Sequence, residues 1–197
     1  MIWLDMPEDF SLLTYKTQTM LHALNRFGGD EFLSSSYDYI MKTDDDSYVG
    51  VDAIHDILER HNNPGYWGYC MFDDIYRLPY RDPDHKYFVS NETWPEEYFP
   101  VWAQGMGFVL SRSFTRCALD FFPTMKFMTM EDVSIGIAAE HCQVPCQSDE
   151  WHSWDDNEKR FTAPLRVEHG IKASGEMLFK HWDNMRILKR GEFGDFV

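Results

Sequence analysis

The stretch Tyr37–Asp46 reads YDYIMKTDDD, a short strand-like apolar run followed by three consecutive aspartates. Within a strand, three adjacent carboxylates would repel one another and one would face the core. At the carboxyl end of a strand they can spread toward the crevice in which open α/β sheets bind their ligands. This stretch therefore predicts an α/β fold with a polar ligand site at the end of one strand.

Two amphipathic helices are predicted on either side of this stretch. The first has apolar and small residues at helical spacing and ends at Gly28-Gly29; its buried face comprises Leu13, Thr17, Met20, Leu21, Leu24 and Phe27. The second follows the aspartates, with Asp52 as its expected N-cap. Its apolar stripe consists of Ile54, Ile57 and Leu58.

The remainder of the chain continues the alternation of strands and helices. Strands are predicted at 66–72, 86–89, 107–110 and 165–167. Helices are predicted after Ser111 or Ser113, after a capping-box pattern at Thr129–Asp132, and from Ser174. Alternating elements predict an α/β sandwich with a mainly parallel sheet, formed by residues 1–197 as a single domain.

Composition limits the classes of partner. The net charge is -15, from 33 acidic and 18 basic residues, which argues against a nucleic-acid backbone as a ligand. Aromatic residues make up 16% of the chain, an excess that suits stacking on flat polar ligands, although core packing is the commoner use. No apolar run approaches the ~20 residues of a membrane helix, and the start of the chain lacks the features of a signal peptide.

The cysteines and one asparagine carry weaker signals. Four cysteines allow three pairings, and the sequence selects none of them. Cys142 and Cys146 lie near His141 and His152 and suggest zinc, but their spacing matches no standard ligand set. Asn91-Glu92-Thr93 is an N-glycosylation sequon in turn-forming surroundings, so Asn91 is expected on an exposed loop.

The aspartate triplet itself supports two interpretations. Its hard oxygen donors suit Mg²⁺ or Mn²⁺, ions that in turn bind a diphosphate. The alternative is an acidic turn that leads into the following helix and has no ligand. The spacing of the triplet alone does not decide between them.

Five blocks in the same order resemble one family. Lys42–Val49 (KTDDDSYV) is similar to the D-x-D segment of the β-1,3-glycosyltransferases of glycosyltransferase family 31, which includes galactosyl-, N-acetylglucosaminyl- and Fringe-type enzymes. The other blocks are Asp9–Thr17 (DFSLLTYKT), Tyr98–Ser111 (YFPVWAQGMGFVLS), Glu131–Gly136 (EDVSIG) and Val167–His181, which begins VEH.

The resemblance implies a role for each matching residue. It assigns Asp46 and His169 to the metal, and Asp132 to the general base that deprotonates the acceptor hydroxyl. Glu131 is the nearby alternative base, or it only caps the helix. The nucleotide-sugar donor is expected to contact Asp44, Asp45, Gly105 and Gly107, whose two glycines let the backbone approach closely. Without the family, His169 is a polar residue at a strand end.

The resemblance also implies a fold and a reaction. We expect the Rossmann-like nucleotide-sugar transferase type A fold, shortened at its N-terminus, because relatives carry a further strand–helix unit and a membrane anchor before the Asp9–Thr17 block. The expected function is inverting transfer of galactose or N-acetylglucosamine from a UDP-sugar to a glycan, glycoprotein or glycolipid hydroxyl. Mn²⁺ or Mg²⁺ is the expected cofactor and the Golgi lumen the expected location, with membrane attachment only through an anchor absent from this chain.

Two rival functions remain at this point. One is a non-catalytic, lectin-like or scaffolding relative with the same fold. The other is a metal-dependent phosphoryl hydrolase that uses the aspartate cluster. Release of UDP from a UDP-sugar would separate the three, because a hydrolase of this kind would also act on phosphate esters that lack a sugar.

Overall fold

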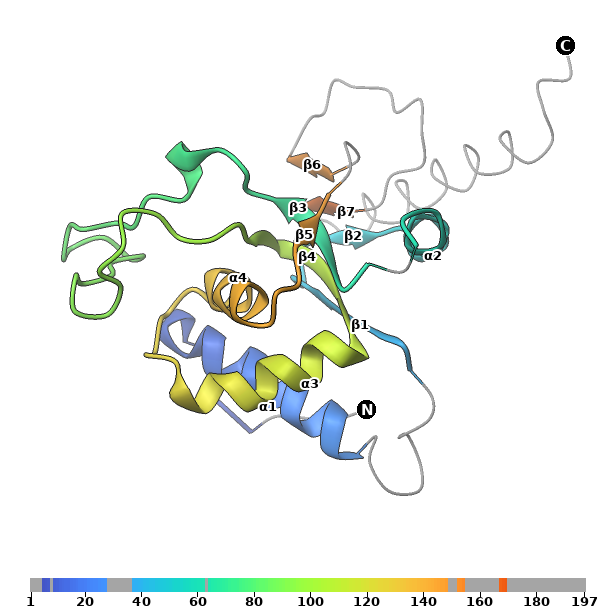
Figure 1. Ribbon diagram of the computed structural model, residues 1–197, viewed down its shortest axis with the longest axis horizontal. Helices are drawn as coiled ribbons and strands as arrows, with labels where there is room; N and C mark the ends of the chain where they lie inside the picture. Colours follow the sequence, from blue (N-terminus) through green and yellow to red (C-terminus); the bar gives the residue numbers. More distant parts are fainter. Residues whose placement is uncertain are drawn as a thin grey trace, which may run out of the picture.

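The computed structural model describes residues 5–7, 9–27, 37–62, 64–148, 152–154 and 167–169. Figure 1 shows the arrangement of its helices and strands. In chain order the elements are η1 (Phe10–Leu12), α1 (Leu13–Phe27), β1 (Tyr39–Thr43), β2 (Tyr48–Val49), α2 (Val51–Arg60), β3 (Tyr66–Cys70), η2 (Asp74–Tyr76), β4 (Ala103–Ser111), α3 (Arg112–Phe121), η3 (Phe122–Thr124), α4 (Glu131–His141), β5 (Cys146–Gln147), β6 (His152–Trp154) and β7 (Val167–His169).

The sheets contain both parallel and antiparallel strand pairs. The four-stranded sheet has the order β1-β4-β3-β5, in which β4 is antiparallel to β1 and β3, and β3 is parallel to β5. The prediction of an α/β fold is confirmed, but the prediction of a mainly parallel sheet is wrong for the described strands. A parallel neighbour needs a crossover back to the starting edge. The connection 71–102 instead leaves β3 and re-enters as β4 in the opposite direction, with only η2 as a helical turn.

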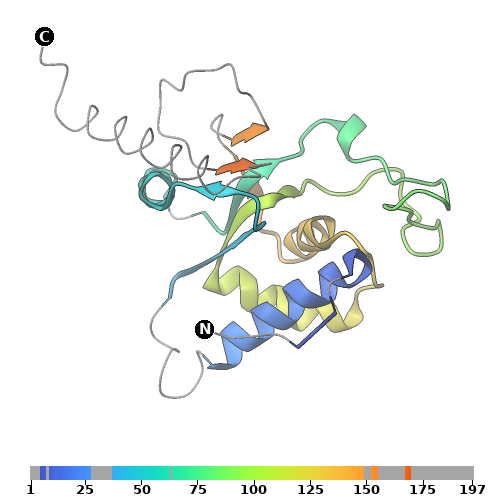
Figure 2. The same cartoon turned by 180° about the vertical axis from the view of Figure 1, so that it is seen from behind.

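The helices cover the two faces of this sheet. Helices α1, α3 and α4 lie together on one face, and α2 lies on the other (Figures 1 and 2). The alternation of a strand explains this arrangement, because neighbouring side chains point to opposite faces. Tyr66 packs with the first group of helices and the next residue, Trp67, packs with Ile54 and Ile57 of α2.

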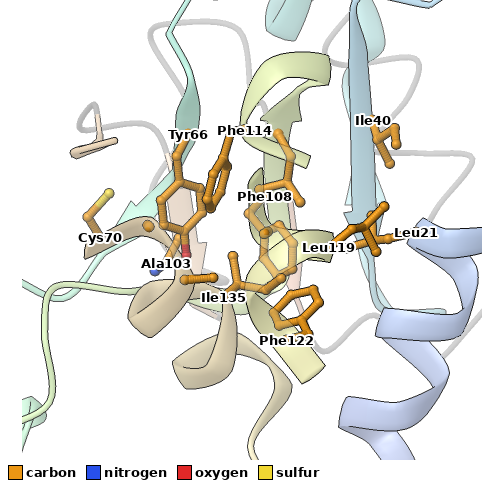
Figure 3. Close-up of a cluster of buried hydrophobic side chains, with 14 residues drawn as sticks. Leu21, Ile40, Tyr66, Cys70, Ala103, Phe108, Phe114, Leu119, Phe122 and Ile135 are labelled. Atoms are coloured by element: carbon orange, nitrogen blue, oxygen red, sulfur yellow. Dashed lines mark hydrogen bonds between the residues drawn. The ribbon is translucent and has the colours of Figure 1, made fainter. Parts of the chain in front are cut away.

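Aromatic side chains fill the larger core, which Figure 3 shows in close-up. The Tyr66 ring lies 5.5 Å from the Phe114 ring and 6.2 Å from the Phe108 ring, measured between centroids. The Tyr66 hydroxyl is buried, and its oxygen accepts a hydrogen bond of 2.7 Å from the backbone N–H of Ala103 (Figure 3). This bond satisfies a polar group that burial would otherwise penalise, and it fixes the start of β4 against β3.

The helix starts agree only partly with the sequence predictions. Ser111 caps α3, since its hydroxyl accepts a 3.2 Å hydrogen bond from the N–H of Phe114. Asp52, however, lies in the first turn of α2, and Gly50 occupies the N-cap. The capping box at Thr129 is also absent: α4 begins at Glu131 after Met130, which offers no side-chain cap. Instead, the Asp132 carboxylate accepts a hydrogen bond from the backbone N–H of Val133, so a side chain of the first turn satisfies an N–H group at the helix start.

The connection 71–102 is a folded loop in which residues 86–89 form no strand beyond one isolated bridge between Phe88 and Tyr80. This strand prediction is therefore wrong. The Arg81 guanidinium holds the loop instead, donating to the carbonyls of Val89 and Trp94 at 2.8 Å each and of Glu96 at 3.1 Å. These bonds replace the backbone ladder that a strand would use. Asn91 lies in an exposed turn of the loop, as predicted.

All four cysteines are paired. Cys70–Cys146 joins β3 to β5, and Cys117–Cys142 joins α3 to the residue that follows α4. The zinc interpretation of Cys142 and Cys146 is therefore overturned, because the two sulfurs belong to different disulfides. No described helix is long and apolar enough to cross a bilayer. The helix predicted from Ser174 and the strand residues 165–166 lie outside the described residues.

Reduction of the disulfides is expected to destabilise the protein by about 3–5 kcal/mol for each bond, because the bonds close loops with sequence separations of 76 and 25 residues. Urea unfolding with and without dithiothreitol measures the loss. The double variant Cys70→Ser/Cys146→Ser should lose more than Cys117→Ser/Cys142→Ser, since its loop is longer. Free thiols in the unreduced, denatured protein would contradict both pairings.

Candidate active site

A buried lysine joins three segments of the chain. The ammonium Nζ of Lys42, at the end of β1, lies 2.6 Å from Oδ1 of Asp44 and 2.9 Å from Oε1 of Glu131 in the first turn of α4. It also donates to the carbonyl oxygen of Gly105 in β4 at 2.7 Å. These three bonds bring together the aspartate triplet, the glycine-containing strand and the EDV block, which lie far apart in the sequence.

The charges around Lys42 favour its protonated, charged form. Burial disfavours the Lys42 ammonium, but the carboxylates of Glu131 and Asp44 outweigh that effect and raise the pKa of Lys42 above its usual value. Glu131 is only 5% exposed, and one of its oxygens is occupied by the lysine. Glu131 is therefore a counterion of Lys42.

Sequence reasoning missed Lys42, although a signal was present. Ile40 and Lys42 are both buried and are separated by two positions of the same strand, so they point to the same face. A lysine at a position that the alternation assigns to the interior is rare unless it is paired. Together with the carboxylates that follow it, the residue could have been identified as the centre of an ion-pair network.

The Asp132 carboxylate is partly buried and is held at both oxygens. Oδ1 accepts a 2.8 Å hydrogen bond from the N–H of Val133, and Oδ2 accepts one of 3.3 Å from the N–H of Gly105. Burial, followed by the charge of Glu131, raises the pKa of Asp132 to about 7, against the opposing influence of Val133, Lys42 and Gly105. A helix N-terminus favours the charged form of a carboxyl, but for Asp132 burial exceeds that stabilisation.

Gly105 is required by close packing. A Cβ at this position would lie 2.7 Å from Oε1 of Glu131, 3.4 Å from Nζ of Lys42 and 3.7 Å from Oδ2 of Asp132. A side chain here would displace the Glu131 carboxylate from its place beside Lys42. Gly107 differs, because it is buried within β4 opposite Thr43 and does not line the cavity described below.

The remaining predicted site residues, Asp45, Asp46 and His169, belong to the turn between β1 and β2 and to the strand that pairs with β2. Asp45 is exposed and Asp46 partly buried in the turn between β1 and β2. The backbone of His169 ends β7, whose preceding residue Glu168 pairs with Tyr48 of β2. The strand pairing therefore brings the backbone of His169 to the segment that directly follows Asp46. Among the residues whose side chains are described, no three histidine, cysteine, aspartate or glutamate side chains gather as a metal site.

A cavity of about 570 Å³ opens beside Asp132. Its acidic end contains Asp44, Glu131 and Asp132 together with the backbone of Gly105. Its opposite wall is apolar and comes mainly from the 71–87 part of the connection between β3 and β4. The volume suits a small organic ligand placed with one polar group at the carboxylates.

Comparison with known proteins identifies the family. The profile of the family described as Galactosyltransferase matches residues 1–150, three quarters of the chain. The chain belongs to the galactosyltransferase family. The family resemblance is thereby confirmed: four of the five sequence blocks and the lysine-centred cluster lie within the matched region, whereas the block Val167–His181 lies beyond it.

Individual members of the galactosyltransferase family are similar at moderate identity. Beta-1,3-galactosyltransferase GALT1 of Arabidopsis thaliana is 36% identical over 130 residues, which cover 65% of this chain and 19% of that protein. Hydroxyproline O-galactosyltransferase GALT5 of the same plant is 37% identical over 111 residues, 55% of this chain and 16% of the relative. Human Beta-1,3-galactosyltransferase 5 is 26% identical over 141 residues, 72% and 43% of the two chains. The chain thus spans less than half the length of these relatives.

Removal of the buried ammonium is expected to be costly. Lys42→Met leaves the carboxylates of Glu131 and Asp44 without their cation, so the free energy of unfolding should fall by about 3–5 kcal/mol. Glu131→Gln in the Lys42→Met background should restore part of that loss. Urea unfolding of the two single variants and the double variant measures the coupling.

A matched lysine provides the control. Lys126 is exposed and donates to the backbone carbonyl of Glu92, so Lys126→Met should change stability by no more than about 0.5 kcal/mol. If the losses of Lys42→Met and Glu131→Gln simply add in the double variant, the two side chains are not energetically coupled and the proposed centre of the site is wrong.

Proposed function

We propose that this galactosyltransferase-family chain carries the catalytic site of an inverting hexosyltransferase. The reaction moves galactose or N-acetylglucosamine from a UDP-sugar to a glycan hydroxyl, with formation of a β-1,3 linkage. The observation that carries the proposal is the Asp132 carboxylate, which lines a cavity, has a pKa raised to about 7, and lies beside a glutamate already paired with Lys42.

The properties of Asp132 suit a general base. In an inverting transfer a base takes the proton of the acceptor hydroxyl on the face opposite the departing nucleoside diphosphate. A base works best when its pKa lies near the operating pH, because it is then both deprotonated and a strong proton acceptor. The N–H groups of Val133 and Gly105 hold the carboxylate in place without neutralising it.

The donor side of the proposal uses the aspartate triplet. Asp44, which is fixed by Lys42, and Asp45 would contact the donor. The backbone at Gly105 would approach the sugar of the donor closely. Gly107 would support that strand rather than touch the ligand. Asp46 and His169 would hold Mn²⁺ or Mg²⁺. A carboxylate oxygen and an imidazole are suitable donors for Mn²⁺, and the pairing of β2 with β7 supports their proximity. When bound, the ion would offset the charge that develops on the departing diphosphate.

The relatives and the disulfides support the finer parts of the proposal. The names of several relatives favour galactose as the transferred sugar and a β-1,3 linkage. The α/β layers support the Rossmann-like transferase type A fold. Two disulfides and an exposed Asn91 sequon suit an oxidising secretory compartment, so we propose the Golgi lumen as the location.

Metal binding is expected to depend on Asp46 and His169 more than on Asp45, which is exposed. Calorimetric titration of Mn²⁺ in the presence of UDP measures the affinity for each alanine variant. Asp56→Ala, an exposed aspartate on α2, is the matched control and should leave the titration unchanged. If Asp45→Ala weakens binding as much as Asp46→Ala, the assignment of the ligands is wrong.

Replacement of Asp132 by Asn is expected to lower turnover about a hundred- to ten-thousand-fold, because the shape is kept and the basicity is lost. In the unmodified chain, kcat/KM should rise as the pH increases through about 7, because the base acts only when deprotonated. This pH dependence should disappear from the residual activity of Asp132→Asn.

The Glu131→Gln variant distinguishes the role of Glu131 from that of Asp132. As the counterion of Lys42, Glu131 should contribute to stability and alignment, so its variant should retain the rise of activity near pH 7. UDP release from UDP-galactose with Mn²⁺ and an acceptor measures both variants. An inactive Glu131→Gln beside an active Asp132→Asn would place the base one residue earlier.

A further inference from the structure

The apolar wall of the cavity exposes large side chains. In the described structure Ile75 is 72% exposed, Tyr76 62%, Tyr80 50% and Leu78 46%, and all four line the cavity. Exposed apolar groups gathered at one site of a soluble domain mark a binding surface. Because the same cavity ends at Asp132, the occupant of this wall must be the molecule whose hydroxyl meets the base.

Hydrogen bonds and ring stacking hold this wall in shape without a ligand. The Arg81 guanidinium ties the loop to three backbone carbonyls, and the N–H of Val89 donates to the carbonyl of Tyr80 at 2.9 Å. The Tyr80 ring also stacks on His85, with centroids 4.1 Å apart and planes inclined by 9°. Figure 1 shows this loop extending from the end of β3 beyond the sheet before it returns as β4. A wall braced in this way can bind a flat surface with little loss of conformational entropy.

The charge of the cavity selects against anions. Its described lining contains three carboxylates, those of Asp44, Glu131 and Asp132, and no lysine, arginine or histidine. Lys42 lies behind this lining and is paired with two of these carboxylates. An acceptor with a carboxylate or sulfate near its reacting hydroxyl would bring like charges together in a partly buried space.

Two polar side chains of the lining require partners. In the part of the chain that the structure describes, the indole N–H of Trp102 and the side-chain oxygen of Gln104 are buried without a hydrogen-bond partner. Both residues line the cavity and flank Ala103 in the sequence. One is a donor and the other an acceptor, so a ligand with several hydroxyl groups could satisfy both. A hydroxyproline ring has a single hydroxyl, which the reaction itself would use.

We propose that this cavity is the acceptor subsite and that it selects an uncharged sugar ring, with Tyr76 and Tyr80 as the specificity-determining residues. The C–H face of the sugar packs on the tyrosine-containing wall, its hydroxyls meet Trp102 and Gln104, and its reacting hydroxyl lies at Asp132. The inference rests on the proposed transfer reaction, and it adds the preference for an uncharged acceptor sugar over a charged sugar or a hydroxyproline, and the residues that choose it.

Binding can be tested separately from catalysis with the full chain. Saturation-transfer NMR without UDP compares N-acetyllactosamine with the same disaccharide oxidised to a uronate at C6 of its terminal galactose. We expect the neutral disaccharide to bind and the uronate to bind at least about tenfold more weakly. Tyr76→Ala and Tyr80→Ala should each weaken binding of the neutral disaccharide about two- to tenfold.

Tyr15→Ala is the matched control, because Tyr15 is also a half-exposed tyrosine but stacks on Phe127 outside the cavity. It should leave the affinity unchanged. Circular dichroism of each variant verifies that it is folded. Equal binding of the uronate, stronger binding of a hydroxyproline peptide, or an affinity insensitive to both cavity tyrosines would overturn the proposal.

A kinetic measurement separates this inference from the reaction on which it rests. UDP release from UDP-galactose with Mn²⁺ should be stimulated by N-acetyllactosamine, with a higher acceptor KM for Tyr76→Ala and Tyr80→Ala. Stimulation with an unchanged KM would retain the transferase function and reject the subsite. Tyrosine-dependent binding of the disaccharide without any UDP release would retain the sugar-binding cavity and reject the transferase function.

Discussion

The site depends on one buried ammonium and the charges it has to balance. Lys42 points inward from β1, so its burial is tolerable only if carboxylates and a carbonyl surround it. That requirement fixes the end of β1 against the start of β4 and the start of α4. It also determines the roles of the neighbouring acids: Asp44 and Glu131 neutralise the lysine, whereas Asp132 remains available at the cavity.

The position of α4 follows from the same constraint and from apolar packing on two sides. Ile135 and Ala138 of this helix pack into the main core, and Val133 and Ile137 pack beneath the loop that precedes β4. A helix buried on both sides cannot rotate to move its first turn into solvent. The carboxylate of Asp132 is therefore held partly buried, which raises its pKa and suits it to accept a proton near neutral pH.

The connection between β3 and β4 combines two properties that are rarely found in one loop. Arginine–carbonyl bonds and ring stacking make it rigid, yet several of its large side chains are exposed on the cavity side. The loop therefore presents a braced apolar surface beside the carboxylate of Asp132. The cavity thus has one apolar wall from the loop and one acidic wall from the start of α4.

The sequence by itself determined the family, the α/β class and several element positions. Local patterns were sufficient because helical spacing, the Ser111 cap and the aspartate triplet act over a few residues. The sequence did not determine strand direction, the cysteine pairing or the pKa of Asp132. Strand direction depends on where the connection 71–102 re-enters the sheet, and the pairing depends on which sulfurs the packed elements bring together.

Asp132 illustrates the difference most clearly. At a helix start, local N–H donors favour the charged form of a carboxyl. Only the tertiary structure buries it next to Glu131, and the free energy of removing a charge from water exceeds the contribution of the helix end. Lys42 is the converse case. The sequence places a cation at an inward-facing strand position, but only the fold brings the carboxylates of Asp44 and Glu131, 2 and 89 residues away, close enough to neutralise it.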